Sequence, residues 1–153
     1  MQKTVLLLLL ILPALAYSQV NINKTKGEIK KEVANLKKTV PAYTFNVSET
    51  DSTLTIIKTD AAKNREDALL EFDKAGKCRS ELRTFYCDQC YKQELEKLLG
   101  IDRYKWKKLN ENQYISKFEE NLMIELPTEN ETNSFSIIRT NWSKVLYDML
   151  TEN

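Results

Sequence analysis

The sequence predicts an α+β fold, in which an antiparallel β-sheet of about six to eight short strands packs against two or three helices. Short segments that alternate apolar and polar residues are separated by short polar turns, and such turns permit only antiparallel pairing because parallel strands need long crossovers. Three other segments carry apolar residues at helical spacing. The order of helix, about four strands, helix, about four strands and helix is compatible with a tandem repeat of an α/β4 unit, and its second half is typical of a meander.

The first 18 residues have the features of a secretory signal peptide. Lys3 supplies a positive start, and Val5–Leu12 is an unbroken apolar run. Small residues in Ala16-x-Ser18 place the cleavage before Gln19, with Ala14-x-Ala16 as the second option. The apolar run is shorter than the roughly 20 residues that a membrane-spanning helix needs. We therefore expect a secreted or periplasmic protein without a membrane span.

Residues 19–153 are expected to form a single α+β domain. The charges of this part balance, since Lys3 accounts for the net charge of +1 of the whole chain. Without a basic stripe, nucleic acid is not an expected partner. Four Asn-x-Ser/Thr sequons, whose use the sequence leaves open, begin at Asn23, Asn46, Asn130 and Asn141.

In the first half, Thr25 and Glu28 form a capping box that predicts a helix over residues 26–38. Residues 60–67 are charged and aperiodic, and are expected to form a loop. Alternation predicts four strands, at residues 43–47, 53–59, 68–73 and 78–86. For the last of these, a helix over residues 79–87 is the alternative.

The central stretch, residues 85–100, joins the two sets of strands. Its apolar residues Tyr91, Leu95, Leu98 and Leu99 have helical spacing. Asp88 is the expected N-cap, and Gly100 is expected to end the helix in a left-handed conformation.

In the second half, alternation predicts three strands, at residues 113–118, 122–126 and 134–140. Asn110–Asn112 and Glu119–Asn121 are expected to be turns. Ser143 or Asn141 is expected to cap a C-terminal helix. This helix carries Val145, Leu146, Met149 and Leu150 on one side.

The three cysteines offer one easy disulfide, between Cys87 and Cys90. If residues 78–86 are a straight strand, Cys78 and Cys87 lie about 30 Å apart, whereas a disulfide needs Cα atoms within roughly 7 Å. We therefore expect a local disulfide at the start of the central helix and a buried thiol at Cys78. Cys-x-x-Cys between a strand and a helix is also the local arrangement of a thiol–disulfide redox site, so Cys87 and Cys90 are the alternative catalytic pair.

The chain contains no histidine, which excludes Ser-His-Asp and Cys-His catalysis and histidine metal ligands. The three glycines are isolated, so phosphate-binding loops are absent. Three cysteines do not complete a structural zinc site without a fourth ligand, and no metal or other cofactor is expected. Tyr104, Trp106 and Tyr114 are candidates to line a ligand groove, with half-buried sheet positions as the alternative.

These observations predict a small exported, non-catalytic domain that binds a protein, peptide or glycan. A thiol–disulfide oxidoreductase that uses Cys87 and Cys90 is the alternative from another class.

Overall fold

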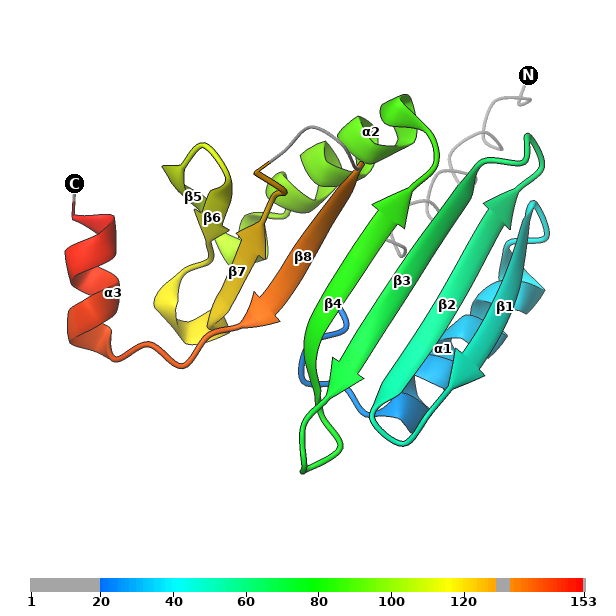
Figure 1. The fold of residues 1–153 in the computed structure, drawn as a ribbon, viewed down its shortest axis with the longest axis horizontal. Helices are drawn as coiled ribbons and strands as arrows, with labels where there is room; N and C mark the ends of the chain where they lie inside the picture. Colours follow the sequence, from blue (N-terminus) through cyan, green and yellow to red (C-terminus); the bar gives the residue numbers. More distant parts are fainter. Residues whose placement is uncertain (1–19, 129–132, 153) are drawn as a thin grey trace, which may run out of the picture.

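The computed structural model describes residues 20–128 and 133–152, and the expected signal peptide lies outside this range. The structure is an eight-stranded, wholly antiparallel sheet with three α-helices (Figure 1), which confirms the predicted α+β class. No α-helix of the described residues is both long enough and apolar enough to cross a membrane.

The elements follow one another as a helix, four strands, a helix, four strands and a helix. The helices are α1 (Lys26–Thr39), α2 (Asp88–Leu99) and α3 (Lys144–Thr151). The strands of the first half are β1 (Tyr43–Glu49), β2 (Thr53–Asp60), β3 (Arg65–Phe72) and β4 (Cys78–Phe85). Those of the second half are β5 (Lys107–Asn110), β6 (Gln113–Ile115), β7 (Leu122–Glu125) and β8 (Ser134–Arg139).

The strand order β1-β2-β3-β4-β8-β7-β6-β5 shows how the two halves are joined. Each half is a helix followed by a four-stranded meander, and the last strands of the two meanders, β4 and β8, pair with each other. The expected α/β4 repeat is therefore present at the level of topology. The second meander is smaller because β5, β6 and β7 are only 4, 3 and 4 residues long.

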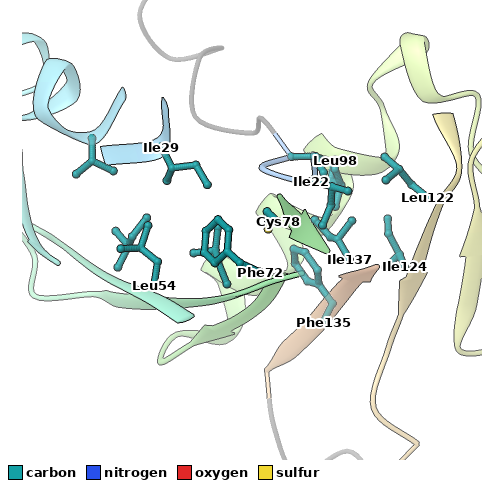
Figure 2. Packing of buried hydrophobic residues seen from close by; sticks show 14 of the residues in the cluster. Ile22, Ile29, Leu54, Phe72, Cys78, Leu98, Leu122, Ile124, Phe135 and Ile137 are labelled. Carbon is teal, nitrogen blue, oxygen red and sulfur yellow. The ribbon is translucent and has the colours of Figure 1, made fainter. Parts of the chain in front are cut away.

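Helices α1 and α2 lie on the same face of the sheet and cover one continuous apolar core (Figures 1 and 2). Ile29 of α1 packs in this core with Leu54, and Leu98 of α2 packs in it with Ile124 and Ile137. Each of these five side chains is almost or completely buried. The other face of the sheet is not covered by α1 or α2 (Figure 1).

Helix α1 begins where the sequence predicts. The Thr25 hydroxyl accepts from the backbone N–H of Glu28, and the Glu28 carboxylate accepts from the backbone N–H of Thr25 at 2.7 Å. The Thr25 backbone N–H and hydroxyl both donate to this carboxylate and lower the pKa of Glu28, with a smaller contribution from Lys77. The reciprocal bonds satisfy backbone donors that a helix start leaves free.

Helix α2 differs from the prediction at both ends. Its N-cap is Cys87, whose sulfur accepts from the backbone N–H of Cys90 at 3.1 Å, so Asp88 is the first helical residue. Gly100 is right-handed, with φ of −78°, and its N–H continues the helical pattern to the carbonyl of Glu96. The helix therefore ends without the left-handed glycine that the sequence suggests.

The expected loop over residues 60–67 is wrong, because β3 begins at Arg65. Glu66 points to the helix-covered face and forms an ion pair with Lys58 of β2, so the charged stretch alternates as a strand does. Cys78–Phe85 is a strand, as expected, and the helical alternative over residues 79–87 is wrong, because α2 begins at Asp88 after its N-cap Cys87.

In the second half, the expected strand over residues 113–118 stops at Ile115. A short 3-10 helix, Phe118–Glu120, follows, and Asn121 ends it in a left-handed conformation. Ser143 caps α3, as one of the two expected candidates, through a hydrogen bond from the N–H of Leu146. Tyr147 is the buried residue of α3, whereas the side of the helix that carries Val145, Leu146, Met149 and Leu150 is exposed.

Candidate functional site: the uncovered sheet face

One row of side chains crosses the uncovered face at the centre of the sheet. The register of the sheet makes Thr55 of β2 the cross-strand neighbour of Leu69 of β3. Leu69 is in turn paired with Leu82 of β4, and Leu82 with Ser136 of β8. Side chains of a strand alternate between the faces. Because Leu70 is fully buried under the helices, its neighbour Leu69 points to the uncovered face. Leu69 and Leu82 are 37% and 38% exposed, which is unusual for paired leucines in the middle of a sheet.

A cluster of Arg65, Asp67 and Tyr86 lies on the same face, beside this row. Arg65 donates two hydrogen bonds of 2.6 Å to the Asp67 carboxylate, which raises the pKa of Arg65. The Tyr86 hydroxyl donates to Asp67 at 3.2 Å, and the Arg65 guanidinium lies 5.0 Å from the Tyr86 ring centroid. Tyr86 is nevertheless largely exposed. The cluster thus presents an aromatic ring in a fixed orientation.

A hollow of about 820 Å³ opens on the second half of the molecule, where the β5–β6 turn, the end of β7 and the start of β8 surround it. Glu125 and Gln113 are cross-strand partners in its lining, with a hydrogen bond of 3.1 Å between them. None of the described residues that line it is basic. The lining is Leu82, Asn110, Glu111, Asn112, Gln113, Glu125, Leu126, Pro127, Thr128, Ser134, Phe135 and Ser136.

The opposite, helix-covered face of β4 holds a buried ionic cluster. Arg83 donates to Glu81 at 2.9 Å and to Glu94 of α2 at 3.1 Å, and all three side chains are almost completely buried. Glu81 also accepts two hydrogen bonds of 3.0 Å from Asn21. Burial alone would lower the pKa of Arg83, but the carboxylates of Glu81, Glu66 and Glu94 raise it overall.

This cluster decides which side chains of β4 reach the uncovered face. Since Glu81 and Arg83 point inward, Leu82 between them must point outward. Hydrophobic alternation alone would assign the opposite orientation. The cluster also binds α2 and the segment around Asn21 to the centre of the sheet. Its role in the site is therefore to orient β4, so that Leu82 lies on the uncovered face.

The aromatic residues proposed from the sequence lie elsewhere. Tyr104 is buried and packs on Trp106, with ring centroids 5.3 Å apart. The Trp106 indole donates to the carbonyl of Leu98 at 3.0 Å, and Tyr114 packs against the same core. The structure thus brings Tyr104, Trp106 and Tyr114 to the helix-covered side, where they support α2. Their role in ligand binding stays a prediction.

Cys87 and Cys90 are at disulfide distance, with Cα atoms 5.2 Å apart, at the start of α2. Cys90 borders a cavity of about 140 Å³ that Arg65, Glu94 and Lys97 also line. Cys78 is a free, buried thiol at the start of β4. Burial, with the nearby charge of Glu81, raises the pKa of Cys78 to about 12, so its reactive thiolate form is suppressed.

Sequence reasoning did not single out Leu69, Leu82 or the Arg65–Tyr86 pair. One signal was present for Leu69, because Leu69 and Leu70 are adjacent and a strand must point one of them to each face. No comparable signal marks Tyr86, which follows the end of β4.

Within the described residues, no three Cys, Asp or Glu side chains gather in a group that could hold a metal ion. In comparisons with known proteins, the chain matches no family model, no curated protein and no solved structure. The geometry of the uncovered face is therefore the basis for the functional argument.

Proposed function

We propose that this protein is a small exported, non-catalytic binding domain whose uncovered sheet face takes a protein partner. The observation that carries the proposal is the exposure of Leu69 and Leu82 next to the ordered Arg65–Tyr86 pair. Tyr and Arg are enriched in the energetic centres of protein interfaces, and an exposed apolar patch rimmed by polar residues is typical of an interaction surface. Export is the part of the proposal supported by the signal-peptide features of residues 1–18.

The shape and chemistry of the face favour a protein over a glycan. Tyr104, Trp106 and Tyr114 pack against the core, so among the described residues Tyr86 is the one largely exposed aromatic side chain on this face. The centre of the face presents aliphatic side chains among Ser and Thr hydroxyls, across strands that are hydrogen-bonded on both sides. A broad, rigid surface of this kind suits a partner that does not have to order a flexible chain on binding.

The absence of histidine from the whole sequence supports a non-catalytic role. Among the described residues, the most strongly buried charged side chains, Glu81 and Arg83, neutralise each other beneath the helices. They lie on the side of β4 that faces away from the proposed interface. The face itself holds Asp67 with both its oxygens engaged by Arg65 and Tyr86.

The test is a comparison of partner capture by matched variants. The wild-type protein and the double variant Leu69→Glu/Tyr86→Ala are immobilised and exposed to the exported proteins of the producing cells, and captured proteins are identified by mass spectrometry. We expect at least one protein that binds the wild type, and the control Lys31→Glu on the exposed side of α1, but not the double variant. Equal capture by the double variant, confirmed as folded by its thermal unfolding, would exclude this face.

A thiol–disulfide enzyme remains the second candidate, because Cys87 lies at the N-terminus of α2. A hydrogen bond from the Cys90 N–H to the Cys87 sulfur, together with the helix dipole, stabilises a thiolate there. Reduction of insulin by the dithiol form of the protein would support this candidate. Loss of that activity in Cys87→Ser would assign the reaction to Cys87. No insulin reduction, with a Cys87 pKa near the ordinary value of about 8.5, excludes it.

A further inference from the structure

The two edges of the sheet differ in how well they are protected against pairing with another strand. β5 forms one edge and β1 forms the other. β5 is only four residues long, carries the exposed Lys107 and Lys108, has a shifted register with β6 and lies beside α3 (Figure 1). Short length, lysines, bulges and a covering helix are features by which natural proteins prevent edge pairing. The β5 edge is therefore protected against further strands.

The β1 edge lacks the short length, the lysines and the bulge. Its seven residues, Tyr43–Glu49, include no lysine and no proline. The register between β1 and β2 is continuous over all seven residues. Most of these residues are exposed. A long, regular and exposed edge strand is a template for pairing with another strand.

The backbone groups that β1 presents at this edge follow from its pairing with β2. The N–H of Thr50 donates to the carbonyl of Thr53 at 3.2 Å, where the two strands are joined. Hydrogen-bonded and non-hydrogen-bonded pairs alternate along an antiparallel ladder. The even-numbered residues of β1 therefore bind β2, whereas the N–H and C=O groups of Val47 and Glu49 face away from it.

The sequence of β1 is complementary to itself when two copies of the strand run antiparallel. The register with the greatest overlap places Asn46 opposite Asn46 of the second copy. Val47 then lies opposite Phe45, and aromatic and β-branched side chains form favourable cross-strand pairs. Glu49 lies opposite Tyr43, so no like charges face each other. Val47 is 36% exposed in the single chain, and this pairing covers it.

We propose that two copies of this chain form a two-fold dimer through their β1 edges, which joins the two eight-stranded sheets into one continuous sheet. A two-fold contact uses the same edge in both copies, so neither β1 edge remains open. The joined sheet then ends in the protected β5 edge on both sides. This inference is independent of the proposed function, because Leu69, Leu82 and Tyr86 belong to the centre of the sheet and not to β1.

The first measurement is the molar mass in solution of protein purified from cells that express the whole chain, by sedimentation from about 1 µM to 1 mM. Pairing of two short strands is a small interface, and small interfaces dissociate readily. We therefore expect the wild type to change from monomer to dimer within this range. Leu69→Glu/Tyr86→Ala should do the same, which separates this dimer from the proposed function. A wild type that stays monomeric throughout would overturn the proposal.

Val47→Pro tests the edge itself. Proline removes the Val47 N–H, which faces away from β2, and edge strands accept proline at such positions. We expect this variant to fold and to stay monomeric over the whole range. Val47→Thr keeps the N–H and the branched shape, and is the matched control that should still form the dimer. A Val47→Pro variant that is folded by thermal unfolding and associates as the wild type does would overturn the proposal.

Charged substitutions at Asn46 test the register. Asn46 is exposed, and its side chain lies on the uncovered face because its neighbour Phe45 is buried beneath α1. Asn46→Lys and Asn46→Glu each place like charges opposite one another in the proposed dimer, so each variant alone should be monomeric. An equal mixture of the two should associate, because opposite charges then face each other. Failure of the mixture to associate, with both variants folded, or wild-type association of either variant alone, would contradict the proposed dimer.

Discussion

At the scale of single residues, Arg83 joins β4 to α2 at the sheet centre. It is fully enclosed and holds Glu81 of its own strand and Glu94 of α2 together. Removing one member of a buried ionic group leaves the others as uncompensated charges, which is more costly than losing a surface pair. The cluster therefore makes the inward orientation of Glu81 and Arg83, and the outward orientation of Leu82, depend on one side chain.

We expect Arg83→Met to lower the free energy of unfolding by about 3–5 kcal/mol. The control is Arg79→Met on the same strand, since Arg79 is exposed and its ion pair with Glu71 should be worth only about 0–1 kcal/mol. Urea unfolding of both variants provides the comparison. Similar losses for the two arginines would show that the cluster contributes little to stability.

Cys78 is the residue whose chemistry burial changes most. Its thiol donates to the carbonyl of Ser80 at 3.4 Å, and its pKa is about 12. A thiol with a raised pKa contributes stability that is present below the unfolded-state value of about 8.5 and is lost as the pH rises towards the folded-state value.

We therefore expect native protein at pH 8 not to react with iodoacetamide at Cys78, and stability to decline above about pH 9. Mass spectrometry after alkylation, in buffer and in denaturant, distinguishes the native from the unfolded chain. Cys78→Ala should show a weaker alkaline decline than the wild type. Rapid native alkylation would mean that Cys78 is accessible.

At the scale of elements, α2 is held by residues of two kinds. Leu98 is completely buried in the core, whereas Leu95 packs at its margin and is only partly buried. Glu94 binds Arg83 on the same side of the helix. The apolar residues that the sequence groups together thus differ in how much stability they supply.

Leu98→Ala should lower the free energy of unfolding by about 2–5 kcal/mol, because the cavity cannot collapse in a close-packed core. Leu95→Ala should cost clearly less. Chemical denaturation of the two variants measures the difference. A larger loss for Leu95 would show that α2 packs with a different side towards the sheet.

At the scale of the whole molecule, Arg139 links the two α/β4 halves and the N-terminal segment. This β8 residue donates to Asp73 at 2.5 Å, in the β3–β4 turn, and to Asn23 at 2.9 Å. Asp73 also accepts from the backbone N–H groups of Ala75 and Lys77, within a turn that Gly76 closes with φ of +72°. The hydrogen bond from Arg139 is the largest of the effects that lower the pKa of Asp73.

A carboxylate with a lowered pKa contributes stability above its unfolded-state pKa, and this contribution is lost as the pH falls through the folded-state value. We expect the wild type to lose stability below about pH 4, and Asp73→Asn to be less stable at pH 7 but to lose less on acidification. Asp51→Asn, on the exposed β1–β2 turn, is the control. Thermal unfolding at pH 7 and pH 3 checks this, and an identical acid response in the Asp73 variant would contradict it.

The sequence by itself determined the elements whose signals are local. The capping box predicted α1, polar turns and alternation predicted the antiparallel strands, and the order of elements indicated the α/β4 repeat. The predicted boundaries of an element were wrong where a side chain pairs with a residue of another element. At β3, the charged start belongs to the strand because Glu66 forms an ion pair with Lys58 of β2. The candidate site was not predicted, because the adjacent Leu69 and Leu70 were its one local signal and nothing in the immediate sequence marks Leu82 or Tyr86.

Only the tertiary structure decided which face of each strand became the surface. In β4 the local pattern would bury Leu82 and expose Glu81 and Arg83, and the structure does the reverse. The reason is that Glu94 on α2 and Asn21 near the N-terminus, both distant in sequence from Glu81, satisfy the buried charges. The same holds for α3, whose apolar stripe looks like a core-facing side but is exposed, because the available packing is taken by Tyr147 against Phe118. Alternation and helical spacing tell which side chains lie together, but which side is buried depends on contacts that form only when the chain has folded.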